Sequence, residues 1–106
     1  MNHNKRAAGH ITGKITDIKN GQPLFNVAIK IRGQNRKVTT DVAGNFRIDN
    51  VKSGECWLEC EHPQYKKNIL NKVYVKQGET AVCECHMVQK YEIKLTLFIF
   101  FILIMF

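Results

Sequence analysis

Six residues that could bind a metal ion or form disulfides lie in two short groups. The first group is Cys56, Cys60 and His62, and the second is Cys83, Cys85 and His86. Thiolate and imidazole groups are common Zn²⁺ ligands, and any four of them would complete a tetrahedral site. The four cysteines could instead pair as disulfides in an oxidising compartment. Which chemistry is possible depends on how the strands of the chain orient these side chains.

The residue pattern around the two groups argues against a metal site. Successive side chains of a β-strand point to opposite faces, so His86 points away from Cys83 and Cys85. Cys56 and Cys60 would lie about 13 Å apart along an extended strand. We therefore predict no metal and no cofactor. The cysteines are predicted to be core thiols that act as small apolar side chains, with a disulfide as the alternative if the chain is exported: Cys56, Cys60, Cys83 and Cys85.

Apolar and polar residues alternate repeatedly between residues 10 and 88, which is the pattern of strands with one buried face. The alternation is found in residues 11–16, 27–32, 37–40, 46–49, 56–62, 73–75 and 81–87. Turn-forming sequences such as "KNGQP" and "RGQN" separate these stretches at intervals of about 8–12 residues. The sequence therefore predicts an all-β sandwich of seven strands over residues 10–89. Residues 1–9 are predicted to form an N-terminal tail, and residues 90–106 an apolar C-terminal tail.

The stretch "TTDVAGNFRI" at residues 39–48 has the composition of a tight turn between two strands. The carboxylate of Asp41 can accept hydrogen bonds from backbone N–H groups about two residues further on. Gly44 can adopt the left-handed conformation that ends the turn, and Phe46 would be the first inward residue of the returning strand. We therefore predict structural rather than catalytic roles for these three residues.

The chain of 106 residues carries 16 Lys and Arg against 9 Asp and Glu, a formal net charge of +7. Such a charge favours contact with anionic surfaces in general and does not select a partner. The basic residues are dispersed and are not interleaved with aromatic residues, so the sequence does not favour nucleic-acid binding. The N-terminal sequence "MNHNKRAAGH" has no apolar run of the kind that a secretory signal needs, so the chain as written is expected to stay in the cytoplasm.

Trp57 and Tyr74 fall on the outward face of their predicted strands. An exposed aromatic pair could stack on sugar rings or contact a protein partner, so these two residues form the candidate ligand- or partner-binding site. The alternative is that loops or the N-terminal segment cover them. Ser53, the only serine, lies in the turn sequence "VKSGE". The sequence therefore lacks a recognisable arrangement of nucleophile and base, and we predict no enzymatic activity.

Five segments of the chain occur in the order found in one known family. They are "ITGKITD", "GQPLFNVAIKIRG", "TTDVAGNFRI", "GECWLECEHPQY" and "VYVKQGETAVCECHMV". Over residues 11–88 the chain resembles the carboxypeptidase regulatory-like domain, a transthyretin-like (prealbumin-like) Greek-key sandwich of seven strands. It departs from the family pattern at Gln64, where a glycine is usual. It also departs at Cys60, Cys83 and Cys85, where aliphatic residues are usual.

The resemblance implies a non-catalytic accessory domain. Such domains follow the catalytic domain of metallocarboxypeptidases, and they precede the plug and barrel of TonB-dependent outer-membrane receptors. The second and third segments are more similar to the receptor group. The resemblance therefore implies a docking module derived from a larger cell-envelope or outer-membrane receptor, with a protein or the rest of that receptor as its partner. A small carbohydrate- or peptide-binding module is the alternative.

The last residues of the chain differ in character from everything before them. Residues 95–106 are uncharged and almost entirely apolar. As a helix they would span about 18 Å, less than the roughly 30 Å of a bilayer core. Three interpretations are open: an end that contacts a membrane, an eighth strand, or the product of a truncated or shifted reading frame.

Overall fold

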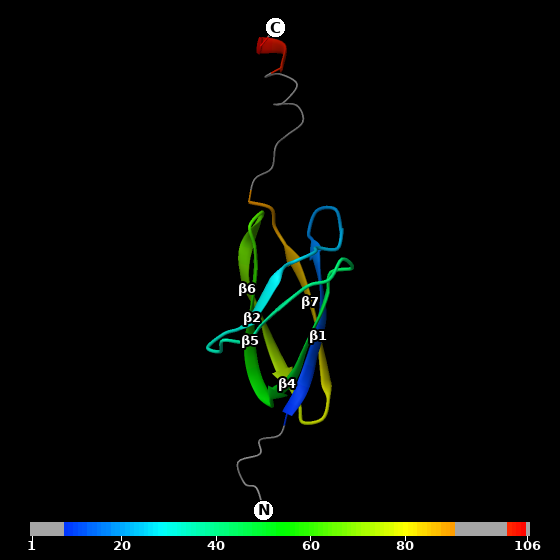
Figure 1. Cartoon of the computed structure of the whole chain (residues 1–106), viewed down its shortest axis with the longest axis vertical. Helices are drawn as coiled ribbons and strands as arrows, with labels where there is room; N and C mark the ends of the chain where they lie inside the picture. The colour runs from blue at the N-terminus through cyan, green and yellow to red at the C-terminus, as the bar shows by residue number, and fades with distance from the viewer. Residues whose placement is uncertain (1–7, 91–101, 106) are drawn as a thin grey trace, which may run out of the picture.

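The computed structural model describes residues 8–90 and 102–105, and within β6 it leaves out the side chains of residues 69–71. The strands are β1 (Ala8–Asp17), β2 (Ala28–Ile31), β3 (Lys37–Thr39), β4 (Asn45–Lys52), β5 (Gly54–His62), β6 (Tyr65–Val75) and β7 (Thr80–Met87). They form two packed sheets, one with the order β4-β1-β7 and one with the order β3-β2-β5-β6 (Figure 1). The predicted all-β sandwich of seven strands is therefore confirmed.

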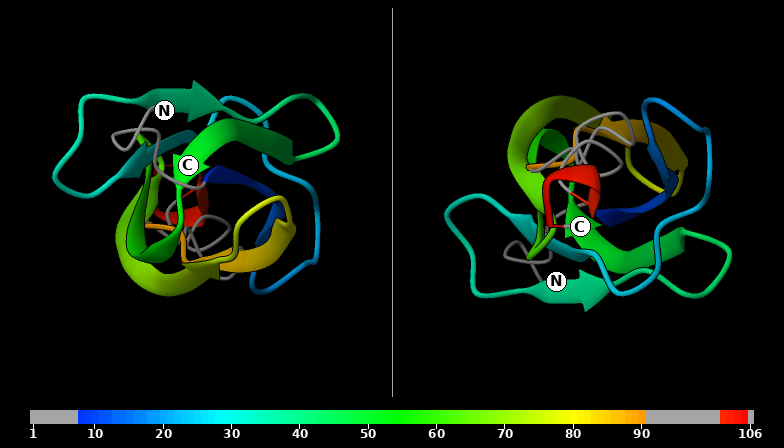
Figure 2. Two further views of the ribbon diagram at one scale, coloured as in Figure 1. Left: turned by 90° about the horizontal axis from the view of Figure 1, so that it is seen from below. Right: turned by 90° about the horizontal axis from the view of Figure 1, so that it is seen from above.

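The two sheets face each other across a single core, which the end-on views show as strands arranged around a common centre (Figure 2). Along each strand the apolar residues of one parity point inward, as the alternation in the sequence predicts, except that β4 changes parity at its irregular pairing with β1, so that Phe46, Ile48 and Val51 are all buried. The first sheet contributes residues such as Ile11, Ile15 and Ile48, and the second contributes Ile29 and Leu58. The fold thus follows from burial of one face of each sheet.

The strand order explains which segments meet at each end of the sandwich. β1 runs parallel to β7 and antiparallel to β4, so β1 and β7 finish at the same end of the molecule (Figure 1). Beyond β7, the backbone N–H of Lys66 donates to the carbonyl of Val88, and the N–H of Lys90 donates to the carbonyl of Gln64. The chain after β7 therefore joins the start of β6 and closes one edge of the sandwich.

Several strands, above all β6, are longer than the sequence pattern predicts. β6 has 11 residues, from Tyr65 to Val75, whereas the alternation predicts a strand only over residues 73–75. Lys66 and Lys67 interrupt the alternation because they lie in a β-bulge, between the pairs that Tyr65 and Asn68 form with β5. β1 begins at Ala8, where its first residues pair with Val51 and Lys52 of β4.

Most of the apolar tail lies outside the described residues. Residues 102–105 form one turn of helix. Among the described residues, no helix is both long enough and apolar enough to cross a bilayer. The three interpretations of residues 95–106 therefore stay as predictions.

Candidate functional site

Trp57 and Tyr74 lie on the outward face of the second sheet, on the neighbouring strands β5 and β6. Trp57 pairs with Lys72, and Tyr74 pairs with Glu55, so the two aromatic residues are diagonal neighbours across the strands. Diagonal side chains of this length lie within reach of one ligand or partner surface. The exposed fraction is 42% for Trp57 and 63% for Tyr74. We call this region, centred on Trp57 and Tyr74, the outer aromatic face.

Ion pairs surround the aromatic residues on the same face. Lys72 Nζ lies 3.0 Å from Glu55 Oε1, and Arg32 Nε lies 3.8 Å from Glu59 Oε1. Lys67 Nζ lies 3.0 Å from Glu61 Oε1, and its hydrogen bond and charge lower the pKa of Glu61. Exposed pairs of this kind add little to stability. Here they place cations next to the carboxylates on the sheet face that also carries Trp57.

A groove borders the outer aromatic face where β6 and β7 diverge. It has a volume of about 330 Å³, and its lining includes Tyr74 on β6 and Val82 and Glu84 on β7. Val82 is 77% exposed. The volume is at the lower end of the range of small-ligand sites, which is about 300–1,000 Å³. The groove therefore extends the surface beside Tyr74 toward the first sheet, with a lining that is mostly polar.

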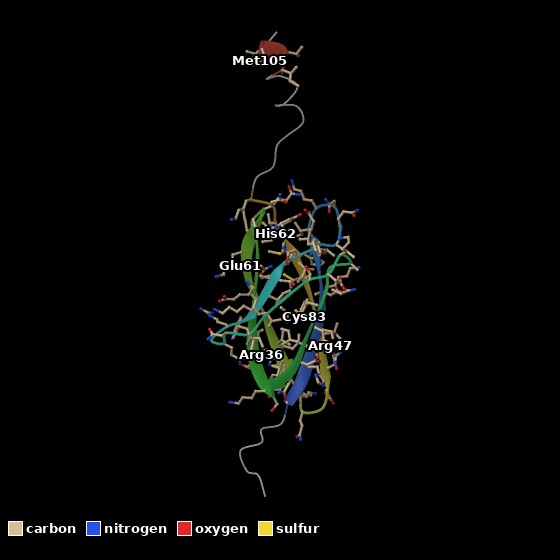
Figure 3. The ribbon with its side chains drawn as sticks, in the orientation of Figure 1. Arg36, Arg47, Glu61, His62, Cys83 and Met105 are labelled. Atoms are coloured by element: carbon tan, nitrogen blue, oxygen red, sulfur yellow. The ribbon has the colours of Figure 1, made fainter. Side chains whose placement is uncertain are left out.

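A larger hollow of about 530 Å³ lies at the other end of β5 and β6, with Glu61, His62, Lys67 and Lys90 among its lining residues. His62 was considered above only as a zinc ligand. In the structure its ring packs edge-on against Tyr65 at a centroid distance of 5.3 Å, and its Nδ1 accepts the backbone N–H of Gln64 at 3.1 Å. His62 therefore shapes the turn between β5 and β6. Figure 3 shows its position near Glu61.

The four cysteines are thiols rather than disulfides in the structure, and they lie at different depths. Cys60, Cys83 and Cys85 are buried, whereas Cys56 is half-buried at the margin of the core. Burial raises the pKa of Cys83 to about 11 and also raises that of Cys56. Cys83 lies between the sheets (Figure 3).

The second histidine of the cysteine and histidine groups points to the outer surface. His86 lies on the outer face of β7, where its Nδ1 is 2.7 Å from Thr16 Oγ1. Within residues 8–90 and 102–105, no three His, Cys, Asp or Glu side chains are placed to hold a metal ion.

The sequence pattern did not identify one buried charged residue. Asp17, at the end of β1, is only 2% exposed. Its Oδ2 accepts hydrogen bonds from Tyr65 Oη at 2.7 Å and Gln89 Nε2 at 2.9 Å. Its Oδ1 accepts the backbone N–H groups of Lys19 at 2.8 Å and Asn20 at 3.3 Å. These bonds, with that from Tyr65 the largest, outweigh the cost of burial and lower the pKa of Asp17 to about 2.

The surroundings of Asp17 indicate a structural rather than a catalytic group. A carboxylate with such a low pKa is a weak base, and both of its oxygens already accept hydrogen bonds. A general base works best when its pKa lies near the working pH. Asp17 instead connects the end of β1 to the start of β6 and to the segment that follows β7.

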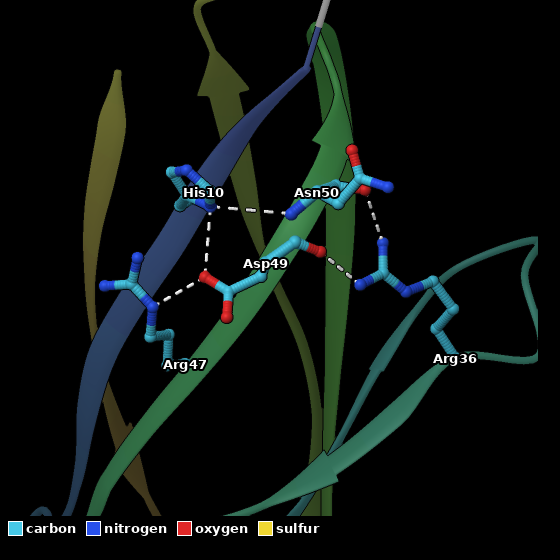
Figure 4. A network of polar contacts seen from close by, with 5 residues as sticks. All are labelled: His10, Arg36, Arg47, Asp49 and Asn50. Carbon is cyan, nitrogen blue, oxygen red and sulfur yellow. Dashed lines mark hydrogen bonds and ion pairs between the residues drawn. The ribbon is translucent and has the colours of Figure 1, made fainter. Parts of the chain in front are cut away.

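A second polar network surrounds Asp49 on the outside of the sandwich (Figure 4). Asp49 and Asn50 together face His10 in a β-bulge between β1 and β4, and Asn50 has a φ of 55°. Asp49 Oδ1 lies 3.0 Å from His10 Nδ1 and 2.6 Å from Arg47 Nε. Arg36 donates to the carbonyls of Asp49 and Asn50. Because Arg36 precedes β3, these bonds connect the two sheets, and the network is structural.

The turn at residues 41–44 has the geometry that its composition predicts. Asp41 Oδ1 accepts the backbone N–H groups of Ala43 and Asn45, both at 2.9 Å. Gly44 has a φ of 78°, and a Cβ at this position would lie 2.6 Å from the carbonyl oxygen of Ile15. Phe46 is the first buried residue of β4. The turn therefore requires glycine at position 44 both for its conformation and for its close contact with β1.

Replacing Asp41 with Ala should lower the free energy of unfolding by about 1 kcal/mol, because two backbone N–H groups lose their acceptor but stay accessible to water. Urea unfolding of the variant measures this change. Val42→Ala is the matched control, since Val42 lies in the same turn and is exposed. Equal stability of the Asp41→Ala and Val42→Ala variants would contradict the structural role of Asp41.

The chain shares its fold with larger proteins of different activities. No curated protein matches the sequence at a significant level. A type II cohesin–X-dockerin complex from Acetivibrio cellulolyticus superposes with a TM-score of 0.61 at 18% identity, over 73% of this chain and 52% of the other. The minor pilin of Streptococcus agalactiae gives 0.64 at 17% identity, over 85% and 48%. The 3-chlorocatechol 1,2-dioxygenase of Rhodococcus opacus 1CP gives 0.59 at 11% identity, over 84% and 63%.

These similarities establish the fold alone, because all three identities are low and the proteins include an enzyme. The chain spans between about half and two thirds of the length of the matched proteins. The family assignment comes from the sequence. The sequence model of the carboxypeptidase regulatory-like domain family matches residues 10–88, which is most of the chain. The chain therefore belongs to the carboxypeptidase regulatory-like domain family.

Proposed function

We propose that the chain is a non-catalytic accessory module that docks onto the rest of a larger cell-envelope protein, of the type of a TonB-dependent outer-membrane receptor. Membership of the regulatory-like family supports an accessory role. The matched solved proteins are longer than this chain, and two of them are a cohesin–dockerin complex and a pilin. A sandwich that serves as one part of a larger assembly is consistent with both facts.

The observation that carries the proposal is the outer aromatic face. Trp57 and Tyr74 expose large apolar surface on a regular sheet, and cations from neighbouring strands lie next to the carboxylates on the same face. Aromatic residues of this kind are enriched at the centres of protein–protein interfaces. The most buried ionisable groups do not favour catalysis, since Asp17 is a weak base and the pKa of the buried thiol of Cys83 is raised.

A second function is supported by the groove beside Tyr74. Trp57 could stack on one ring of a glycan while the adjoining sugar enters the groove between Tyr74 and Val82. A bound peptide could place a side chain in the same groove. This would make the chain a small carbohydrate- or peptide-binding module that uses the same face. The two functions differ in their ligand: the first requires the remainder of a receptor, whereas the second requires a soluble glycan or peptide.

Intrinsic fluorescence separates the two functions, because Trp57 is the only tryptophan of the chain. Titration with soluble oligosaccharides and extended peptides should leave the emission of the full chain unchanged if the module docks only onto its receptor. A saturable shift that Tyr74→Ala weakens at least about tenfold, equivalent to 1.4 kcal/mol, would instead establish the second function. Val42→Ala is the control, because Val42 is exposed in a turn outside the outer aromatic face.

A further inference from the structure

Cys60 and Cys85 belong to different sheets but meet inside the core. Cys60 lies on β5 and pairs across the strands with Asn68 of β6. The side-chain amide of Asn68 donates to Cys85 Sγ, on β7, at 3.1 Å. Cys85 is also the largest cause of the raised pKa of Cys60, which places the two thiols close together. The two sulfur atoms are therefore neighbours across the space between the sheets.

The other two cysteines are placed differently. Cys83 is buried two residues before Cys85 on the same strand, and Cys56 is half-buried at the margin of the core. Cys85 is the largest cause of the raised pKa of Cys60, whereas burial is the largest cause for Cys83, to which Cys85 and Cys56 add less. Cys60 and Cys85 are both only 1% exposed. The positions of the four cysteines thus single out Cys60 and Cys85 as the pair that could be linked across the core.

We propose that Cys60 and Cys85 form a disulfide that links the two sheets when the chain folds in the presence of a small-molecule disulfide oxidant. The thiolate of one cysteine attacks the oxidant, which releases one small thiol and leaves a mixed disulfide on the protein. The second cysteine then attacks the protein sulfur and releases the second small thiol. Two protein thiols are oxidised to one disulfide, and the oxidant is reduced to two thiols.

The disulfide forms while the chain folds, before the core has closed around the two thiols. In the native core, the contact with Cys85 and burial both raise the pKa of Cys60, so its reactive thiolate is suppressed. In the unfolded chain both thiols are accessible, and the packing of the two sheets then brings them together. The disulfide would restrict the unfolded chain between residues 60 and 85 and so raise stability.

The test is to refold the full chain from denaturant in a mixture of oxidised and reduced glutathione. The folded protein is then unfolded in denaturant that contains an excess of the alkylating reagent, digested and mapped by mass spectrometry. We expect one linked peptide pair that contains Cys60 and Cys85, with Cys56 and Cys83 alkylated. Alkylation of both Cys60 and Cys85, or a link that uses any other pair of cysteines, would overturn the proposal.

Two double variants provide a matched comparison. Cys56→Ala/Cys83→Ala keeps the proposed pair, and its oxidised form should unfold at a higher urea concentration than its reduced form. Cys60→Ala/Cys85→Ala keeps only the other pair, and its two preparations should unfold at the same concentration. The opposite pattern would overturn the proposal. If either variant fails to fold, the mass-spectrometric map of the linked cysteines in the unsubstituted chain decides whether Cys60 and Cys85 form the disulfide.

Discussion

Replacing Asp17 with Ala should lower the free energy of unfolding by about 3–5 kcal/mol. The substitution leaves the hydroxyl of Tyr65, the amide of Gln89 and two backbone N–H groups without their acceptor. Each buried donor that loses its partner costs about 1–3 kcal/mol, although water that enters the space reduces the sum. Urea unfolding measures the effect, and Tyr65→Phe, which removes a single donor, should cost only about 1 kcal/mol. A loss below that of Tyr65→Phe would contradict the anchoring role of Asp17.

The same carboxylate should make the protein sensitive to acid. The pKa of Asp17 falls from 3.8 to about 2 on folding, so its contribution is fully present above about pH 4 and is lost as the pH falls toward 2. A shift of this size corresponds to roughly 2 kcal/mol. Asp17→Asn should therefore be less stable than the unsubstituted chain at neutral pH, and its stability should fall less between pH 4 and pH 2. An unchanged acid dependence in this variant would contradict the low pKa.

Replacing Gly13 with Val should lower the free energy of unfolding by about 3 kcal/mol or more. β1 is the central strand of its sheet, and a Cβ at Gly13 would lie 2.2 Å from the carbonyl oxygen of Cys83 on β7. It would also lie 2.5 Å from the ring of Phe46 on β4. Both neighbours would have to move, because one contact is with backbone and the other is with a buried ring.

Lys14→Val is the matched control for Gly13→Val, because it introduces the same β-branched side chain at the next position of the strand. Lys14 is exposed and its side chain points outward. Its replacement should change the free energy of unfolding by less than about 0.5 kcal/mol. Thermal or urea unfolding compares the two variants. Similar midpoints for both would show that the close contacts of Gly13 do not limit the packing of β1 between β4 and β7.

The sequence predicts the strands well where side chains alternate and poorly where they do not. The alternation in residues such as Ile29 and Ile31 follows from burial of one face, so it is visible in the sequence. The first half of β6 is held by backbone hydrogen bonds to β5, and its residues Lys66 and Lys67 carry no apolar signal. The outward parity of Trp57 and Tyr74 could be predicted, but their diagonal relation depends on the pairing of β5 with β6.

Long-range polar contacts lie beyond what a sequence pattern can indicate. Asp17 is separated by 48 residues from Tyr65 and by 72 from Gln89. The pairing of β1 with β7 brings Gln89 to it, and the packing of the two sheets brings Tyr65. The approach of Cys60 to Cys85 has the same origin, because these residues lie on facing sheets. Strand periodicity determines which way a side chain points, whereas its partner across the core depends on how the sheets stack.

The proposed origin in a larger envelope receptor is tested most directly by sequencing the encoding locus on both sides and reading every frame. The account predicts an export signal upstream of the codon for Met1, and plug and barrel sequence that resumes downstream of the sandwich. An uninterrupted intergenic region on both sides would contradict it. The chain would then act alone, and the apolar residues 95–106 would be a genuine part of its function.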